Sequence, residues 1–159
     1  MSEPVVRPAR AADAALIFDF VLRLAEYEKL SHAVTATRDD LGALLFGPEP
    51  RALCDLVELD GGPVGFCLWF HTVSTFAGRA GIWIEDLFVL PEARGRGAGV
   101  ALLKALARRC LRDGLGRIDW AVLDWNAPAI GFYERIGSQP LEDWRLRRLS
   151  GGALEALAR

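Results

Sequence analysis

Apolar and polar positions alternate with helical spacing in the first third of the chain. Between residues 13 and 30, apolar side chains recur every three or four positions and predict an amphipathic helix whose buried face holds Leu16, Ile17, Phe20, Val21 and Leu24. A second, short helix is expected from Thr37 toward Leu45, because Thr37 and Asp40 have the spacing of a capping box.

The middle of the chain has the patterning of β-strands. Residues 51–59 and 64–73 predict a hairpin with a tight turn. The residues expected to supply its turn conformations are Gly61, Gly62 and Pro63. After a loop over residues 74–81, the run IWIEDLFVL at residues 82–90 predicts a further strand, since it is rich in branched and aromatic side chains.

The last third alternates between helical and extended patterns. A helix is expected over residues 97–113, ended by Gly114, and a strand over residues 117–123. A short helix over residues 126–137 and a final strand over residues 139–149 follow. This order predicts a single α/β domain of the α+β type, with a mixed sheet and helices packed on it.

Length and composition agree with one globular domain over residues 1–159. The net charge of -2 offers no basic surface for a nucleic acid. No run reaches the roughly 18 apolar residues that a membrane span needs, and the first ten residues lack the apolar segment of a secretion signal. We therefore expect no nucleic-acid or membrane partner and a cytoplasmic location.

The few cysteines and histidines do not indicate a metal site. Cys54, Cys67 and Cys110 are widely spaced in apolar segments, so we expect buried, unpaired thiols rather than disulfides or a metal cluster. His32 and His71, the two histidines, lie far apart in the sequence. We predict that no metal is bound.

A glycine-rich turn, RGRGAG at residues 94–99, joins the strand at 82–90 to the helix that follows. The N-terminus of a helix presents backbone N–H groups and a positive dipole end, so such a turn suits a phosphate. Gly97 and Gly99 would let a ligand approach the backbone, and Arg94 and Arg96 would add countercharge. The alternative is a plain loop.

Two common phosphate motifs do not fit this turn. A P-loop requires Lys and then Ser or Thr after its last glycine, whereas Val100 and Ala101 follow Gly99. The dinucleotide fingerprint needs a longer spacing between its second and third glycines.

The chain resembles the GNAT superfamily of N-acetyltransferases, whose acetyl-CoA turn reads Arg or Gln, two residues, Gly, one residue, Gly or Ala. Arg94, Gly97 and Gly99 match that pattern, and DWNAPAIGFYERIG at residues 124–137 is similar to the second cofactor segment. The stretches VVRPARAAD, LAEYEKL, IEDLFV and WRL resemble the spermidine/spermine (diamine) and thialysine acetyltransferase branch. The resemblance implies a mostly antiparallel mixed sheet with helices on both faces, and a homodimer whose subunits both contribute to the acceptor site.

The resemblance also implies roles for particular residues. Acetyl-CoA would be contacted by Leu87, Phe88, Val89, Arg94, Gly95, Arg96, Gly97, Ala98, Gly99, Asn126, Ala127, Pro128 and Ala129. The general acid would be Tyr133. A small amine substrate would be contacted by Tyr27, Glu28, Glu85, Asp86 and Glu142. The segments that would shape the acceptor pocket, at residues 71–81 and 139–148, depart from the polyamine enzymes, so the acceptor is the least defined part.

The chemistry of acetyl transfer agrees with these residue types. An amine that arrives as an ammonium must lose a proton, and a carboxylate can attract it and accept that proton. Adjacent residues of a regular strand point to opposite faces, so Glu85 and Asp86 would share a face only at a bulge. We favour Glu85 as the base. Backbone N–H groups of residues 87–89 could polarise the thioester carbonyl, and Tyr133 could protonate the departing thiolate.

Each of these side chains also has a purely structural interpretation. Glu85 and Asp86 could pair with arginines at a strand end, and Tyr133 shares helical spacing with Ile130 and Ile136, as a core residue would. The function expected is acetyl transfer from acetyl-CoA to a small cationic amine, such as a polyamine or a basic amino acid. The alternatives are a peptide or protein N-acetyltransferase and a non-catalytic acyl-CoA sensor.

Overall fold

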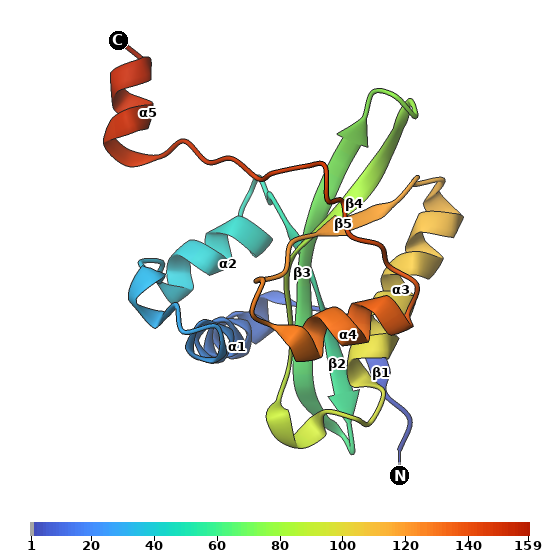
Figure 1. The fold of residues 1–159 in the computed structure, drawn as a ribbon. Helices are drawn as coiled ribbons and strands as arrows, with labels where there is room; N and C mark the ends of the chain where they lie inside the picture. Colours follow the sequence, from blue (N-terminus) through green and yellow to red (C-terminus); the bar gives the residue numbers. More distant parts are fainter. Residues whose placement is uncertain (1) are drawn as a thin grey trace. The chain divides into compact units, whose positions relative to one another are not determined.

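The computed structural model describes residues 2–159, which fall into two compact units, residues 2–121 and residues 122–159 (Figure 1). The first unit holds the whole sheet, and the second holds two short helices and their connections. The prediction of a single domain over residues 1–159 stays a prediction.

The sheet of the first unit has five strands in the order β1-β2-β3-β4-β5. Their bounds are β1 Val5–Pro8, β2 Leu53–Leu59, β3 Gly62–Ser74, β4 Arg79–Val89 and β5 Ile118–Trp120. The first four strands pair antiparallel with their neighbours, and β5 lies parallel to β4. The mixed, mostly antiparallel sheet is therefore confirmed.

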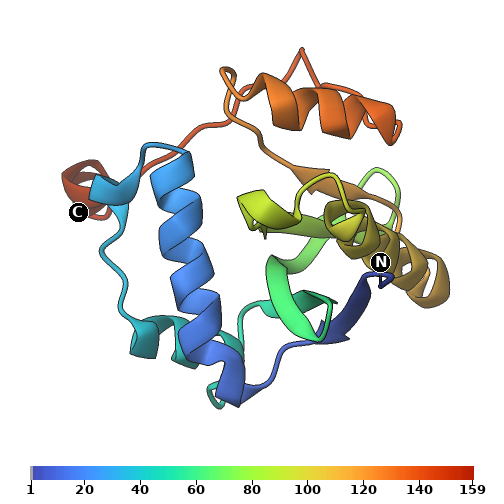
Figure 2. The ribbon, with the colours of Figure 1, turned by 90° about the horizontal axis from the view of Figure 1, so that it is seen from below.

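Helices cover both faces of this sheet (Figure 2). Helices α1 Ala14–Tyr27 and α2 Arg38–Phe46 lie on one face, and α3 Ala98–Asp113 lies on the other. Short 3-10 turns η1 Ala11–Asp13, η2 Ser31–Ala33 and η3 Pro91–Ala93 connect these elements. The arrangement gives the sheet two apolar faces, as the sequence predicts.

The core between α1, α2 and the sheet is built from the predicted apolar positions. Ile17 and Phe20 of α1 are almost completely buried, and the ring of Phe20 stacks on that of Phe66 in β3 with centroids 5.8 Å apart. Phe88 of β4 belongs to the same cluster. Helix α1 therefore packs against β4, the strand that precedes the glycine turn.

Local signals in the sequence place several elements correctly. Thr37 Oγ1 accepts from the Asp40 N–H at 3.2 Å, and the Asp40 carboxylate accepts from the Thr37 N–H at 2.8 Å, so the capping box that begins α2 is confirmed. Helix α3 ends at Gly114, whose φ of 67° is left-handed. All three cysteines are buried and unpaired, as expected.

Three predicted strand boundaries are wrong. The β2–β3 turn is made by Asp60 and Gly61, both with positive φ, whereas Gly62 and Pro63 belong to β3. Strand β4 begins at Arg79, so the predicted loop over residues 74–81 is shorter. Strand β5 ends at Trp120 rather than extending to residue 123. Strand ends depend on which neighbour is available for pairing, and a single sequence does not carry that information.

Strand β1 was not predicted, and the predicted final strand over residues 139–149 is wrong. Within Val122–Arg159 the described residues form α4 Ala127–Arg135 and α5 Gly151–Leu157, joined by irregular backbone. The apolar residues of that connection, including Leu141, Trp144 and Leu146, are exposed. An alternating pattern makes a strand only when a partner strand supplies hydrogen bonds, and no pairing is found for this segment among the described residues.

Candidate active site

Strand β4 carries a β-bulge at Glu85. In its pairing with β3, Ile84 lies opposite Trp69 and Asp86 lies opposite Leu68, so Glu85 is an extra residue without a partner. A bulge interrupts the regular alternation of side chains between the two faces of a sheet. The sequence analysis expected Glu85 and Asp86 to share a face only if a bulge interrupts the strand, and the structure has that bulge.

The bulge turns both carboxylates toward the α1 side of the sheet. Asp86 lies opposite Leu68, which belongs to the core cluster under α1. The side chain of Glu85 lies on the same side as Trp83, whose Nε1 donates to Glu85 Oε2 at 3.1 Å. Trp83 in turn lies opposite Phe70, which packs against the same cluster. Sequence reasoning missed this role of Trp83, although its spacing of two residues from Glu85 on one strand was a usable signal.

Glu28 completes an acidic cluster with Glu85 and Asp86. It caps the C-terminal end of α1 and is half-buried. Burial raises its pKa. The pKa of Asp86 is raised to about 7, first by burial and then by the negative charges of Glu85 and Glu28. A carboxyl group with such a pKa exchanges its proton readily at neutral pH.

Among residues 2–159, no strand lies beside the end of β4 on its β5 edge. The parallel pairing joins only Ile82–Ile84 to Ile118–Trp120, and β4 continues to Val89. Pairing between the two strands stops at Ile84 because β5 ends at Trp120. Residues 85–89 therefore lie beyond the part of β4 that pairs with β5, at the end of the strand that leads into the glycine turn.

The glycine turn lies at the N-terminus of α3, where the sequence places it. Gly95 and Gly97 have φ of 74° and 84°, and Gly97 is the N-cap of α3. The first N–H groups of a helix have no partner within the helix, and α3 is long enough, at 16 residues, to have a substantial dipole. A Cβ on Gly95 would meet no atom within 4 Å, so the turn leaves room for a ligand.

Both arginines of this turn contact other parts of the first unit. Arg94 Nε donates to the Val89 carbonyl at 3.0 Å, and its guanidinium lies 4.7 Å from the centre of the Tyr27 ring. Arg96 pairs with Asp60 at 2.6 Å. Arg94 therefore links the predicted cofactor turn to a predicted substrate residue of α1, and the role of both arginines as phosphate countercharge stays a prediction.

The remaining predicted site residues lie in the second unit. Asn126 is buried and is the N-cap of α4, where its Oδ1 accepts from the Ala129 N–H at 3.4 Å, and Pro128 occupies the first turn. Tyr133 lies on α4 next to Phe132 and is half-buried. Glu142 is exposed on the irregular segment after α4. The roles assigned to these residues stay predictions.

Comparison with known proteins now decides the family. The model of the acetyltransferase (GNAT) family matches residues 17–137. The chain belongs to this family. It is 36% identical to a thialysine N-epsilon-acetyltransferase of Mus musculus, with 99% of each chain covered. It is 29% identical to an L-ornithine acetyltransferase of Arabidopsis thaliana, with 96% of this chain and 86% of the relative covered.

The solved structures agree with this fold. An integron cassette protein from the mobile metagenome of V. cholerae superposes with a TM-score of 0.81 at 23% identity, covering 100% of this chain and 99% of the other. The chain is thus an N-acetyltransferase with the family's fold, and the GNAT family uses acetyl-CoA.

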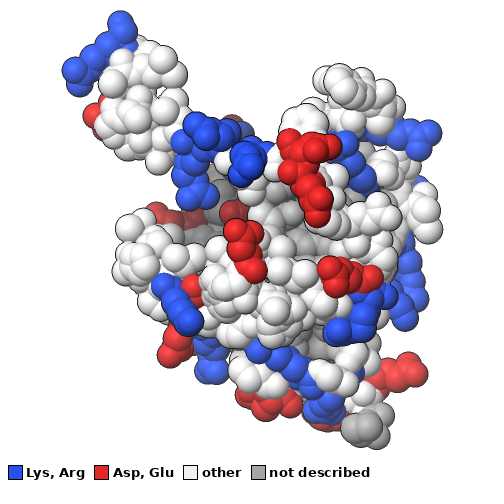
Figure 3. Space-filling model, viewed as in Figure 1, with Lys and Arg blue, Asp and Glu red and all other residues white. Residues whose placement is uncertain are grey.

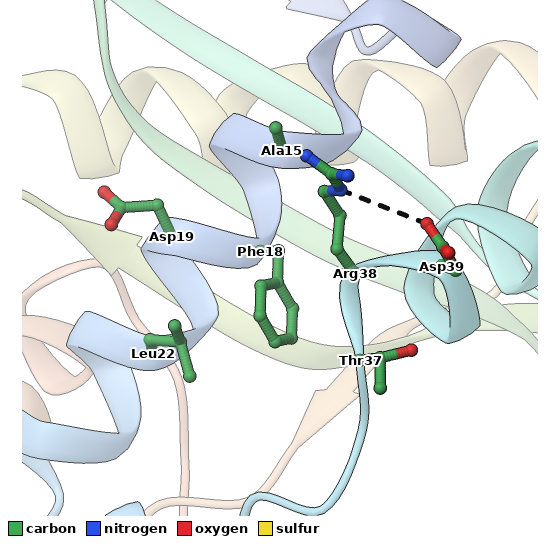
Figure 4. Close-up of a pocket in the computed structure, with 7 residues that line it drawn as sticks. All are labelled: Ala15, Phe18, Asp19, Leu22, Thr37, Arg38 and Asp39. Carbon is green, nitrogen blue, oxygen red and sulfur yellow. Dashed lines mark ion pairs between the residues drawn. The ribbon is translucent and has the colours of Figure 1, made fainter.

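This acetyltransferase also has a shallow hollow of about 510 Å³ between α1 and the start of α2 (Figure 4). It is lined by Ala15, Phe18, Asp19, Leu22, Thr37, Arg38 and Asp39. None of the residues predicted to bind the cofactor or substrate lines it. The hollow is therefore distinct from the acidic cluster.

Other features of the acetyltransferase bear on partners. On the face shown in Figure 3, acidic and basic groups are interspersed among uncharged ones. Among residues 2–159, no three His, Cys, Asp or Glu side chains are grouped so that they could hold a metal ion. No helix in that range is both long and apolar enough to cross a membrane.

Proposed function

We propose that this acetyltransferase transfers the acetyl group of acetyl-CoA to the primary amine of a small cationic acceptor, a polyamine or a basic amino acid, in a ternary complex. The observation that carries the proposal is the acidic cluster of Glu28, Glu85 and Asp86 at the end of β4, directly before the glycine turn. Three carboxyl groups attract an ammonium group and favour it over a neutral amine.

The names of the relatives support a small basic acceptor. Thialysine and L-ornithine are named as the substrates of two relatives that align over nearly the whole chain. Both are amino acids with a cationic side-chain amine. We infer that Tyr27 and the acidic cluster hold such an amine, and a substrate-binding role for Glu142 stays a prediction from the resemblance.

Acetyl-CoA fits the residues of the first unit. Leu87, Phe88 and Val89 pair with β3 on one edge and lie beyond β5 on the other, where a backbone N–H directed to that edge could polarise a carbonyl oxygen. The turn from Arg94 to Gly99 would hold the pyrophosphate at the N-terminus of α3. The resemblance also implies cofactor contacts for residues 126–129, and this stays a prediction. When bound, acetyl-CoA supplies the activated acetyl thioester.

Tyr133 is the proposed general acid, and the substitution Tyr133→Phe tests it. The change removes one hydroxyl and leaves the ring in place. Loss of a general acid lowers turnover by a factor on the order of 10² to 10⁴. The affinity for acetyl-CoA, measured by calorimetry, should remain unchanged. A purely structural tyrosine would show a lower melting temperature with turnover nearly preserved.

A screen of amines with acetyl-CoA, followed by thiol release, tests the function itself. Turnover with diamines, polyamines or basic amino acids and little with neutral amines is the expected result. Acetyl-CoA binding without thiol release for any amine would favour a sensor. Turnover with peptides alone would favour a peptide N-acetyltransferase. The homodimer and the cytoplasmic location stay predictions that rest on the resemblance and the sequence.

A further inference from the structure

The bulge on β4 places its two acidic residues in different surroundings. Glu85 is exposed, and its carboxylate accepts a hydrogen bond from Trp83 Nε1. Asp86 is half-buried and lies opposite Leu68, against the apolar core under α1. The two neighbouring carboxyl groups on one face therefore differ in hydration and in hydrogen bonding.

We infer that Asp86 takes the proton from the ammonium group of the acceptor, and that Glu85, held by Trp83, binds the cation without taking the proton. This assignment rests on the proposed function and replaces Glu85 as the base. The bulge is what makes it possible, because a regular strand would turn Asp86 and Glu85 to opposite faces.

The groups around Asp86 favour its protonated form. Burial is the largest cause, and the negative charges of Glu85 on its own strand and of Glu28 at the end of α1 add to it. The buried thiol of Cys54 on β2, which lies opposite Leu68, belongs to the same cluster, and burial raises its pKa. The guanidinium of Arg94 is directed to the Val89 carbonyl and the Tyr27 ring. Burial, together with the charges of Glu85 and Glu28, raises the pKa of Asp86 to about 7.

A carboxylate with this pKa is a better proton acceptor than an ordinary one. An alkyl ammonium has a pKa of about 10. Proton transfer to a carboxylate whose pKa is about 4 is therefore unfavourable by about six pKa units, whereas transfer to a carboxylate whose pKa is about 7 is unfavourable by about three pKa units. The hydrogen bond from Trp83 instead fixes the direction of the Glu85 carboxylate, as suits a group that binds the cation.

The protons balance over the complete reaction. The ammonium gives one proton to Asp86, and the amine nitrogen then bonds to the acetyl carbonyl carbon. The bond between that carbon and sulfur breaks, and the second proton of the nitrogen reaches the sulfur, with Tyr133 as the proposed donor to the thiolate. Asp86 finally releases its proton to water, so one proton appears in solution for each amide formed.

The pH dependence of kcat/KM separates the two carboxylates. The wild type should show an acidic limb near pH 7, well below the limb that a substrate amine gives near pH 10. Asp86→Asn should remove the lower limb and reduce kcat by a factor on the order of 10² to 10⁴. Glu85→Gln should raise KM about tenfold or more and keep the limb, moved to lower pH because one negative neighbour is gone. Asp39→Asn is the matched control, since the Asp39 side chain is 95% exposed on α2.

A second measurement needs no activity. The pKa of Asp86 is higher in the folded than in the unfolded protein, so the folded protein holds the extra proton between about pH 4 and pH 7. Wild-type stability should therefore lose this contribution as pH rises through that window. Asp86→Asn should lack this loss and be the more stable protein, relative to wild type, above pH 7. Parallel stability curves for the two proteins would overturn the inference.

The kinetic outcomes distinguish this inference from the proposed function. If the wild type acetylates cationic amines but the limb near pH 7 disappears in Glu85→Gln and persists in Asp86→Asn, the assignment of the base is wrong and the function stands. If the wild type acetylates no amine, the proposed function is wrong, and the role of Asp86 as proton acceptor is overturned with it.

Discussion

Replacing Gly97 by alanine tests whether the glycine turn depends on a left-handed backbone. Gly97 has a φ of 84° as the N-cap of α3. A Cβ built on it has Pro4 Cγ as its nearest neighbour, 3.7 Å away, which is an ordinary contact. Steric conflict with the rest of the unit therefore contributes little. The cost of Gly97→Ala arises from the backbone conformation of the residue itself.

The expected size follows from that conformation. A non-glycine residue in the left-handed region costs about 1–2 kcal/mol. For a chain of this length, this corresponds to a melting temperature lower by about 2–8 °C. Gly42→Ala is the matched control, because a Cβ on Gly42, in the interior of α2, would meet no atom within 4 Å. That change should stabilise the protein by about 0.5–1 kcal/mol.

Urea and thermal unfolding of both variants measure the difference, and calorimetry with acetyl-CoA measures its functional consequence. Gly97→Asp adds a carboxylate where the pyrophosphate is proposed to bind, so it should abolish acetyl-CoA binding while the protein stays folded. The reasoning is refuted if Gly97→Ala is as stable as the wild type. Unchanged acetyl-CoA affinity in Gly97→Asp would show that the turn is a plain loop.

Two further substitutions test how the first unit is held together. Asp55→Ala should destabilise the protein by about 3–5 kcal/mol in urea unfolding. The Asp55 carboxylate lies 2.9 Å from the buried Trp69 Nε1 and 3.6 Å from the Arg109 guanidinium, and the substitution leaves both groups without this acceptor. A loss of stability below about 1 kcal/mol would contradict this. Gly65→Ala should raise KM for acetyl-CoA, because a Cβ there would lie 2.4 Å from the Phe88 carbonyl oxygen and push the end of β4 aside. Unaltered kinetics of that variant would contradict the proposed use of this backbone segment.

The sequence by itself determined the parts of this protein that depend on neighbours along the chain. The helix α1 follows from apolar spacing, the start of α2 from Thr37 and Asp40, and the ends of α3 from Gly97 and Gly114. These signals act over three or four residues, within one turn of a helix, so they can be read without knowledge of the fold. The resemblance of two separate motifs to the GNAT superfamily predicted the family, and the family is confirmed.

Only the tertiary structure decided which strands pair and where their register shifts. Strand β1 exists because residues 53–59 lie beside it, and the alternating segment after α4 has no such partner among the described residues. The bulge at Glu85 depends on how β3 and β4 align across a hairpin, and the surroundings of Asp86 depend on α1 packing over that alignment. Pairing and burial join residues that are distant in sequence, so the properties of this carboxyl group were set by contacts that no local pattern encodes.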